Sequence, residues 1–410
     1  MLGTTRWGNA GLTLQDPNGY ECPVGSARWA GTVSLLHPAQ RAGQLRELVG
    51  QFPELAEGSV GAHQFPEPVE GSTTQPGLRR VAGRDRPARA FGFVVTQIPP
   101  ARFAPSDVVE RALDAAYVQA REVREGRNAQ VYPALAEADP ELFGLSLVAT
   151  DGRVWDRGDA EAGFAFMSVA KPFTFALVAA HLGAGRARDE LGVAATGAAF
   201  NAVEPVLAGD GRTNPMVNAG AIAACSRLPG ASGGEKLTHL LDGLSAFAGR
   251  RLAVNEELYE NVMATNVRNR ELTEALTAKG QLVGDPEDAL VLYTMQSCLW
   301  VNAHDLAVMG ATLANGGVNP VTGVRVIGAE LIRPVLAVMI TAGLYELSGE
   351  WLYDVALPAK TGLGGGIVTV APGLAGIGGF SPPIDAGANT VRGVRATAQV
   401  AADLGLGLFG

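Results

Sequence analysis

The sequence predicts an α+β fold, in which helices flank one antiparallel sheet and a helical subdomain is inserted into it. Two observations support this prediction. Strand-like segments occur near residue 145 and again beyond residue 355, and most segments between them have the apolar spacing of helices. The 410-residue chain is 47% apolar and 18% charged, which is enough apolar material for a large core. Because the early and late strands must meet in one sheet, we expect one folded unit from residue 105 to residue 410.

Residues 1–104 differ from the rest of the chain. They are rich in Gly, Pro, Arg and Gln, and segments such as QFPEPVEGSTTQPGLRRVAGRDRPAR have neither a helical nor a strand period. We interpret this region as a disordered extension. Two alternatives stay open: translation begins near residue 100 and the leader is a gene-start artefact, or the region is a small partner-binding arm that uses Trp7 and Trp29.

The folded unit is expected to begin with a helix and a hairpin. The segment APSDVVERALDAAYVQAREV has apolar residues at helical spacing, with Ser106 as the candidate N-cap. The segment LFGLSLVATDGRVWDRGD predicts a hairpin, because Asp151-Gly152 tolerates the positive φ angles of a tight turn. A further helix is expected from about Lys171 to Leu182, ended by Gly183.

The middle of the chain is predicted to be mostly helical, and its end returns to strands. Five segments between residues 235 and 343 carry an apolar stripe with a period of 3.6 residues. The segments WLYDVALPAKTG, GGIVTVAPG and GLAGIGGFSPP are interpreted as short strands separated by Gly and Pro turns. A closing helix is expected over VRGVRATAQVAADLG.

Charge and composition narrow the classes of partner. The net charge of -9 argues against nucleic acid and against an anionic membrane surface, since both normally require clustered Lys and Arg. The longest apolar runs are roughly half a membrane span, and the N-terminus lacks the pattern of an export signal. Three widely spaced cysteines do not form a disulfide framework. We therefore expect a cytoplasmic protein that acts on a small molecule.

The first chemical motif is Ser168-Val169-Ala170-Lys171 at the start of a predicted helix. Residues three apart share a helix face, so the hydroxyl and the amine are expected to touch. A serine hydroxyl needs a base to become a nucleophile, and a lysine with a lowered pKa can supply one. The helix N-terminus disfavours an ammonium group and offers N–H groups to an oxyanion. Taken alone, the motif fits a capping serine followed by a surface lysine equally well.

The second motif is Lys360-Thr361-Gly362. Only four of the 32 cationic residues are lysines, and two of these four lie in the two motifs. A KTG segment downstream of SxxK is the pattern of penicillin-recognising enzymes, in which the lysine adds positive potential and the strand edge adds backbone donors. The glycines that follow do not indicate a nucleotide site, because no GxxxxGK[ST] is present and no GxGxxG opens a helix.

Between the motifs, Asn218 stands among small and apolar residues in TNPMVNAGAI. Its amide offers both a donor and an acceptor, either to an amide substrate or to the lysine, and a helix-capping role is equally compatible. His181, His239 and His304 fall on predicted helices without HExxH spacing or an acidic partner in register, so no metal site is expected.

Six segments together resemble the bacterial and mitochondrial glutaminase family, over about residues 105 to 408. They are FMSVAKPF, TNPMVNAGAI, RNRELTEAL, LYTMQSC, ITAGLYELSGEWLYDVALPAKTGLGGGI and FSPPIDAGANTVRG. The resemblance implies a fold similar to that of serine β-lactamases and hydrolysis of L-glutamine to L-glutamate and ammonia. It also implies that no cofactor is needed and that the protein is a homodimer or homotetramer.

The resemblance assigns roles to individual residues. Ser168 would be the nucleophile, Lys171 its activating partner, and Tyr293 the phenol that relays a proton to the leaving ammonia. The α-amino and α-carboxylate groups of glutamine would be held by Asn218, Asn269 and Tyr345. The N–H groups of Ser168 and Leu363 would form the oxyanion hole, and Lys360 would set the local positive potential.

Two positions depart from the family pattern. Val262 stands seven residues before Asn269, where the family usually has a glutamate, so a contact to the substrate amino group is missing or replaced. Val131 stands where a tyrosine is expected, with Tyr132 offset by one residue. Two other readings therefore stay open: a β-lactamase or D,D-peptidase-like hydrolase, and a glutamine-binding module without turnover.

Overall fold

The computed structural model describes residues 14–15, 21–22 and 103–409. Its contacts divide the chain into two compact units, Met1–Glu57 and Gly58–Gly410. In the first unit, β1 (Leu14–Gln15) and β2 (Glu21–Cys22) pair as antiparallel strands. The predictions for residues 1–104, including those that involve Trp7 and Trp29, fall almost entirely outside the described residues and stay predictions.

The described part of the second unit mixes helices with short strands, as predicted. Its helices are α2 (Ser106–Arg121), α3 (Pro133–Ala136), η2 (Met167–Ala170), α4 (Lys171–Leu182), α5 (Ala184–Leu191), α6 (Glu204–Ala208), α7 (Asn218–Ser226), α8 (Gly233–Ala248), α9 (Glu256–Thr265), α10 (Val267–Ala278), α11 (Pro286–Ser297), α12 (Ala303–Ala314), η3 (Ala329–Leu331), α13 (Ile332–Ala342), η4 (Tyr345–Leu347), α14 (Ser348–Asp354) and α15 (Val391–Asp403). Its strands are β3 (Arg127–Asn128), β4 (Gly144–Ala149), β5 (Val154–Gly158), β6 (Phe164–Ala165), β7 (Ala253–Val254), β8 (Leu299–Val301), β9 (Ala359–Thr361), β10 (Gly366–Ala371), β11 (Ala375–Phe380) and β12 (Pro383–Ile384).

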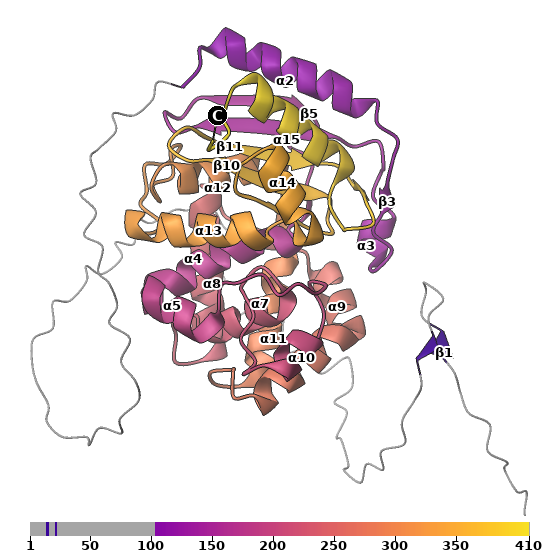
Figure 1. Ribbon diagram of the computed structural model, residues 1–410, viewed down its shortest axis with the longest axis vertical. Helices are drawn as coiled ribbons and strands as arrows, with labels where there is room; N and C mark the ends of the chain where they lie inside the picture. Colours follow the sequence, from indigo (N-terminus) through magenta and orange to yellow (C-terminus); the bar gives the residue numbers. More distant parts are fainter. Residues whose placement is uncertain (1–13, 16–20, 23–102, 410) are drawn as a thin grey trace, which may run out of the picture. The chain divides into compact units, whose positions relative to one another are not determined.

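The central sheet joins the two ends of this unit. Its strand order is β5-β4-β11-β10-β9, and every neighbouring pair is antiparallel. The early hairpin meets the late strands directly, with Leu147 of β4 opposite Ile377 of β11. The helices from α4 to α13 lie between β5 and β9 in the sequence. Of these, α5 and α7 to α11 lie below the central sheet in Figure 1, whereas α12 lies beside it. The predicted sheet with an inserted helical subdomain is confirmed.

Helices cover both faces of the sheet. On one face, α2 and α15 pack together over an apolar cluster that includes Leu113, Leu147 and Val400. On the other face, α12 packs against β4, β10 and β11. This contact explains the glycines of β11, because a side chain at Gly376 would collide with the backbone of α12.

Two sequence predictions about local structure are wrong. Ser106 is the first residue of α2 and not its cap; Pro105 holds the cap position, and the Ser106 hydroxyl accepts a hydrogen bond from Arg153 at 3.3 Å. The residues WLYD belong to helix α14, so the strand starts only at Ala359. Trp351 anchors this helix, because its buried indole donates to the carbonyl of Leu357 at 2.7 Å.

Within residues 103–409, no single helix has the length and apolarity needed to cross a membrane. Two bent helix pairs, Met167–Leu182 with Ala184–Leu191 and Ala329–Ala342 with Tyr345–Asp354, meet that criterion by length and composition only.

Candidate active site

Ser168 lies in a tight turn that enters the helical region. The turn is η2, which follows β6 and leads directly into α4. Met167 has a φ of 47°, a left-handed conformation that is uncommon for a residue other than glycine. The Ser168 side chain is 9% exposed. This strained turn places the hydroxyl at a pocket and its backbone near the N-terminus of α4.

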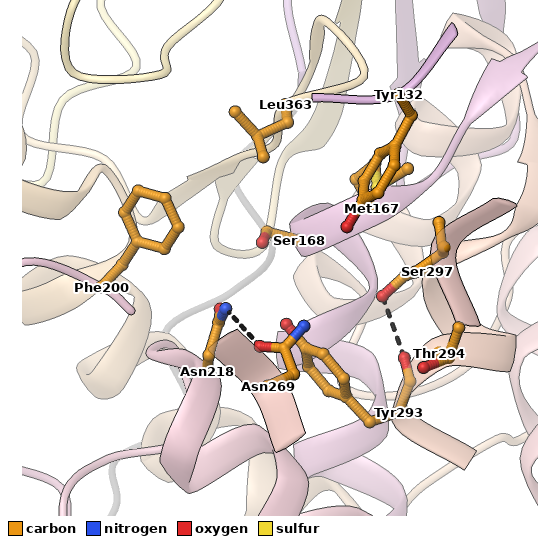
Figure 2. Close-up of a pocket in the computed structure, with 11 residues that line it drawn as sticks. Tyr132, Met167, Ser168, Phe200, Asn218, Asn269, Tyr293, Thr294, Ser297 and Leu363 are labelled. Carbon is orange, nitrogen blue, oxygen red and sulfur yellow. Dashed lines mark hydrogen bonds between the residues drawn. The ribbon is translucent and has the colours of Figure 1, made fainter. Parts of the chain in front are cut away.

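A small pocket surrounds Ser168. Five of its lining residues were predicted from the sequence as site residues: Ser168, Asn218, Asn269, Tyr293 and Leu363. The pocket is completed by Tyr132, Met167, Phe200, Val262, Thr294 and Ser297. In Figure 2, Ser168 lies between the two asparagines below and Leu363 above. Segments more than 200 residues apart in sequence therefore meet at one hydroxyl group.

Lys171 lies beside this pocket in the first turn of α4. Its side chain is 2% exposed, and burial lowers the pKa of its amine to about 7. The pKa shift has the direction expected from the sequence, and burial is its largest cause. Among the described residues, the Lys171 amine donates to Asn218 Oδ1 at 2.7 Å and makes no hydrogen bond to Ser168 Oγ. The Lys171 amine thus donates to Asn218, and a hydrogen bond to Ser168 is not among those that it forms.

A chain of side-chain amides continues from Lys171. Because an ammonium group can only donate, Asn218 presents its oxygen to Lys171 and its Nδ2 to the next residue. The donations run from Asn218 to Asn269 (2.9 Å), from Asn269 to Asn266 (2.5 Å), from Asn266 to Thr294 (3.3 Å), and from Thr294 to the carbonyl of Leu290 (2.9 Å). The polar groups of α7, α10 and α11 are thereby held in one orientation.

This chain decides between the two interpretations of Asn218. The residue preceding it, Val217, occupies the cap position of α7, and the Asn218 side chain is engaged by Lys171 and Asn269. Asn218 is therefore not a helix cap, and its amide lies where it can orient Lys171. Asn266 was missed from the sequence, although its position three residues before Asn269 was an available signal.

Tyr345 and Lys360 lie next to each other outside the pocket lining, with the Tyr345 ring against Phe200 of the pocket. Tyr345 has a φ of 56°, its phenol donates to the carbonyl of Thr361 at 3.3 Å, and the Ser168 hydroxyl lies near enough to lower the pKa of this phenol in part. Burial raises the pKa of Tyr345 to about 12. The Lys360 amine lies 4.1 Å from the centre of the Tyr345 ring and donates to the Thr361 carbonyl at 2.6 Å. Burial, followed by the charge of Lys171, holds the pKa of Lys360 well below its usual range.

Gly362 lets the KTG turn lie directly against the nucleophile. A Cβ atom at this position would lie 3.0 Å from the Ser168 nitrogen and 3.1 Å from the Val169 nitrogen. The turn is closed by the Gly365 N–H, which donates to the Gly362 carbonyl at 3.0 Å, and Gly365 has a φ of 87°. Leu363 is thereby held at the pocket beside the Ser168 backbone.

Replacing Gly362 with alanine is expected to lower kcat by roughly 10²-fold, the usual cost of losing one oxyanion donor. The added methyl group must push the turn away from the Ser168 N–H. Gly185→Ala is the matched control, because a Cβ atom there meets nothing within 4 Å. Kinetics and thermal unfolding of both variants test this. A Gly362→Ala enzyme with unchanged kcat contradicts the role assigned to the turn.

The family is decided by comparison with known proteins. Residues 126–409 match the family model described as Glutaminase. The chain belongs to the glutaminase family. Glutaminase 2 of Yersinia pestis is 51% identical over 285 residues, which is 69% of this chain and 84% of that protein. The glutaminase of Brucella suis biovar 1 is 41% identical over 305 residues, 74% of this chain and 96% of that one.

Solved structures agree with this assignment. A structure described as probable glutaminase ybaS has a TM-score of 0.74 and 38% identity, covering 75% of this glutaminase and 99% of that chain. A Bacillus glutaminase has a TM-score of 0.67 and 28% identity, covering 73% of this chain and 99% of that one. The fold is therefore the β-lactamase-like fold of glutaminases, and the enzyme is an amidohydrolase that acts on the side-chain amide of glutamine.

The two departures from the family pattern occupy different places. Val131 is 57% exposed, whereas its neighbour Tyr132 lines the pocket. Val262 also lines the pocket, on α9, where it is 4% exposed. Tyr132 therefore brings a phenol to the site despite its offset in sequence, whereas Val262 brings no polar group.

Other singled-out residues of this glutaminase lie apart from the pocket lining. His304 contacts Asp156 of β5 at 3.2 Å, an acidic partner that the sequence did not predict, and the contact raises the pKa of His304. Cys225 and Cys298 are both buried. Among residues 103–409, no three His, Cys, Asp or Glu side chains gather as metal ligands do.

Proposed function

We propose that this glutaminase cleaves L-glutamine to L-glutamate and ammonia through a glutamyl-enzyme on Ser168. The Ser168 oxygen bonds to the side-chain carbonyl carbon, and the carbon–nitrogen bond then breaks as the nitrogen leaves with an added proton. Water next attacks the ester, which releases glutamate and restores the hydroxyl. The observation that carries this proposal is the buried Lys171, with a pKa of about 7, held by Asn218 beside the pocket that contains Ser168.

Lys171 is proposed to take the proton from Ser168. A neutral amine keeps two N–H groups and one lone pair, so it can donate to Asn218 and still accept a proton. A base with a pKa near the working pH is the most effective one. When substrate binds Asn218, the hydrogen bond from the Lys171 amine to Asn218 is weakened. The amine is then free to reach Ser168 Oγ. The Lys360 amine lies over the Tyr345 ring, and its protonated form is proposed to add positive potential to the site.

Tyr293 is proposed to pass the proton on to the leaving ammonia. Its ring centre lies 5.8 Å from the Lys171 amine, and burial raises the pKa of its phenol well above the usual value, so the group stays protonated between transfers. Asn218, Asn269 and Tyr345 are proposed to hold the substrate, and the N–H groups of Ser168 and Leu363 to form the oxyanion hole. The proximity of Ser168 to the Tyr345 phenol makes Tyr345 the competing candidate for the relay.

Two single variants distinguish these phenols. If Tyr293 is the relay, Tyr293→Phe lowers kcat by about 10²-fold or more, the usual range for general acid–base catalysis. Tyr345→Phe then acts mainly through KM, because it removes a substrate contact. Steady-state kinetics of both variants with L-glutamine measure the split. A larger loss of kcat in Tyr345→Phe than in Tyr293→Phe reassigns the relay to Tyr345.

Ammonia release from L-glutamine by the purified protein tests the reaction, with L-asparagine and a penicillin reporter as comparison substrates. We expect turnover of the glutamine side-chain amide and no lasting acylation by penicillin. Covalent labelling by penicillin without ammonia release would favour the β-lactamase-like alternative. Binding of glutamine without ammonia release would favour the binding-module alternative, for which Val262 is the motivating residue.

We also propose that the enzyme works in the cytoplasm as a homodimer or homotetramer, with glutamine as its small-molecule partner and without nucleic acid, membrane or cofactor. The family resemblance motivates the oligomer, and the three widely spaced cysteines, which do not form a disulfide framework, motivate the compartment. Light scattering during size-exclusion chromatography, together with fractionation of cells that express the full chain, tests both statements. A monomer, or recovery outside the cytoplasm, contradicts them.

A further inference from the structure

The amide chain that starts at Lys171 ends on the backbone of α11. Thr294 is fully buried, and its hydroxyl donates to the carbonyl of Leu290, one helical turn earlier, at 2.9 Å. A hydroxyl has one proton, so toward Asn266 this oxygen can only accept. Asn266 therefore has to present its Nδ2 to Thr294, which it does at 3.3 Å. The far end of the chain thus fixes the orientation of one amide independently of Lys171.

This fixed end sets the orientation of each amide back to the amine. With its Nδ2 bound to Thr294, Asn266 presents its Oδ1 to Asn269. Asn269 in turn presents its Oδ1 to Asn218, the bond drawn in Figure 2. Asn218 then has its oxygen toward the Lys171 amine, at 2.7 Å. All three asparagines are buried, so bulk water does not compete for these bonds.

The orientation of the Asn218 amide matters most when Lys171 is neutral. A protonated amine can only donate, so it selects the Asn218 oxygen by itself. A neutral amine also has a lone pair, and a reversed Asn218 amide would donate its Nδ2–H to that lone pair and occupy it. A chain that is anchored at its far end disfavours the reversed orientation. The lone pair of Lys171 then stays available for the Ser168 proton.

The titratable groups that act on Lys171 come from three other elements. They are the thiol of Cys225 on α7, the phenol of Tyr293 on α11 and the amine of Lys360 on β9. Burial raises the pKa of Cys225 and of Tyr293, so both stay uncharged at neutral pH. None of these three groups favours a proton on Lys171 as a carboxylate would. The direction of the hydrogen bond to Asn218 therefore affects how readily the amine accepts a proton.

We propose that Thr294 and Asn266 are positioning residues that act through Asn218. By anchoring the amide chain to α11, they keep the lone pair of Lys171 out of hydrogen bonding and available to Ser168. Neither residue touches the reacting atoms in this account. The inference rests on the role of Lys171 as the base in the proposed function.

Thr294→Val tests the anchor, because valine has the same shape and no hydroxyl. Without the anchor, the neutral enzyme divides between the active and the reversed chain, whereas the protonated enzyme keeps the active one. We therefore expect kcat/KM for L-glutamine above the inflection near pH 7 to fall about fivefold or more, the effect of one buried hydrogen bond.

The position of the inflection distinguishes this loss from others. In Thr294→Val it is expected to move to lower pH by the logarithm of the factor by which the alkaline kcat/KM falls. Well below the inflection, kcat/KM is expected to equal that of the wild type, because the protonated form is unchanged. Initial rates of both proteins across this pH range measure the two effects together.

Three further variants serve as controls. Thr294→Ser keeps the hydroxyl and is expected to keep the wild-type profile. Thr312→Val removes another fully buried hydroxyl, which donates to the carbonyl of Val308 at 2.9 Å, but Thr312 lies on α12 and outside the pocket lining. It is expected to leave the profile unchanged. If Thr294→Val does not fold, Asn266→Leu removes the next link and is expected to give the same paired effects.

Three results overturn the inference. An inflection that moves to higher pH shows that the substitution admits water to Lys171, since hydration favours the ammonium form. A uniform loss of kcat/KM at every pH shows that Thr294 acts on substrate binding or on stability. An unchanged profile shows that the chain needs no anchor.

The outcomes also separate this inference from the proposed reaction. If wild-type kcat/KM has no inflection near neutral pH, or if Lys171→Met keeps its activity, Lys171 is not the base and the inference falls with that role. If the wild-type inflection is present and only the paired effects in Thr294→Val are missing, the base stands and the anchor alone is overturned.

Discussion

Replacing Ser168 with alanine is expected to reduce ammonia release from L-glutamine by about 10⁴-fold or more, since removing a serine nucleophile has effects of that order in other hydrolases. The pocket residues Asn218 and Asn269 stay in place in this variant, so KM is expected to change little. Neither of the other serine and threonine hydroxyls in the lining is free to replace Ser168, because Ser297 donates to the Tyr293 carbonyl and Thr294 donates to the Leu290 carbonyl. Stopped assays at high enzyme concentration measure the residual rate.

Ser245→Ala is the matched control for this experiment. Ser245 is buried to nearly the same extent as Ser168, at 8% against 9%, but its hydroxyl accepts a hydrogen bond from the Leu252 N–H in the helical core. This variant is expected to lose about 1 kcal/mol of stability and to keep its kcat. Substantial turnover by a folded Ser168→Ala enzyme contradicts the assignment of the nucleophile.

Replacing Lys171 with methionine is expected to lower kcat by roughly 10²- to 10⁴-fold, the contribution of a general base. In the wild type, kcat/KM is expected to rise as pH increases through about 7, because only the neutral amine accepts the Ser168 proton. The methionine variant loses this inflection. Initial rates of both proteins, measured at pH values below and above 7, test the prediction. A wild-type kcat/KM that does not change through neutral pH contradicts it.

Lys171→Met is also expected to change how the free energy of unfolding depends on pH. The pKa of Lys171 is about 7 in the folded protein against 10.5 for an exposed lysine, so between these values the unfolded chain holds a proton that the folded chain does not. The free energy of unfolding of the wild type therefore rises with pH across this window. In Lys171→Met this contribution is absent. The stability of the variant relative to the wild type is therefore expected to be highest below neutral pH and lowest at alkaline pH. Denaturant unfolding at two pH values measures the difference, and parallel pH dependence in the two proteins contradicts it.

Sequence patterns predicted the parts of this enzyme that depend on neighbours along the chain. The turn at Gly152, the end of α4 at Gly183 and the SxxK and KTG motifs are all local signals, and each lies where it was expected. The error at WLYD has a physical origin, since four residues cannot separate a period of 2 from a period of 3.6. Burial of Trp351 then decided for the helix.

The contacts of the site depend on segments that meet only in the folded molecule. The link from Lys171 to Asn218 and onward to Asn266 needs α4, α7 and α10 to converge, and nothing in their separate sequences fixes which amide oxygen faces which donor. The approach of Tyr345 to Ser168 likewise joins positions far apart in the chain. Sequence reasoning therefore named candidate reacting groups and expected Lys171 to touch Ser168, whereas in the structure the Lys171 amine donates to Asn218.

The glutamyl-enzyme is tested most directly by partitioning between water and hydroxylamine. L-Glutamine and the γ-methyl ester of L-glutamate carry the same acyl group with different leaving groups, so a shared acyl-enzyme must divide in the same way whichever substrate formed it. We predict one ratio of γ-glutamyl hydroxamate to glutamate for both substrates at a fixed hydroxylamine concentration, with both products lost in Ser168→Ala. A ratio that changes with the leaving group, or products that persist in the alanine variant, would contradict a common intermediate on Ser168.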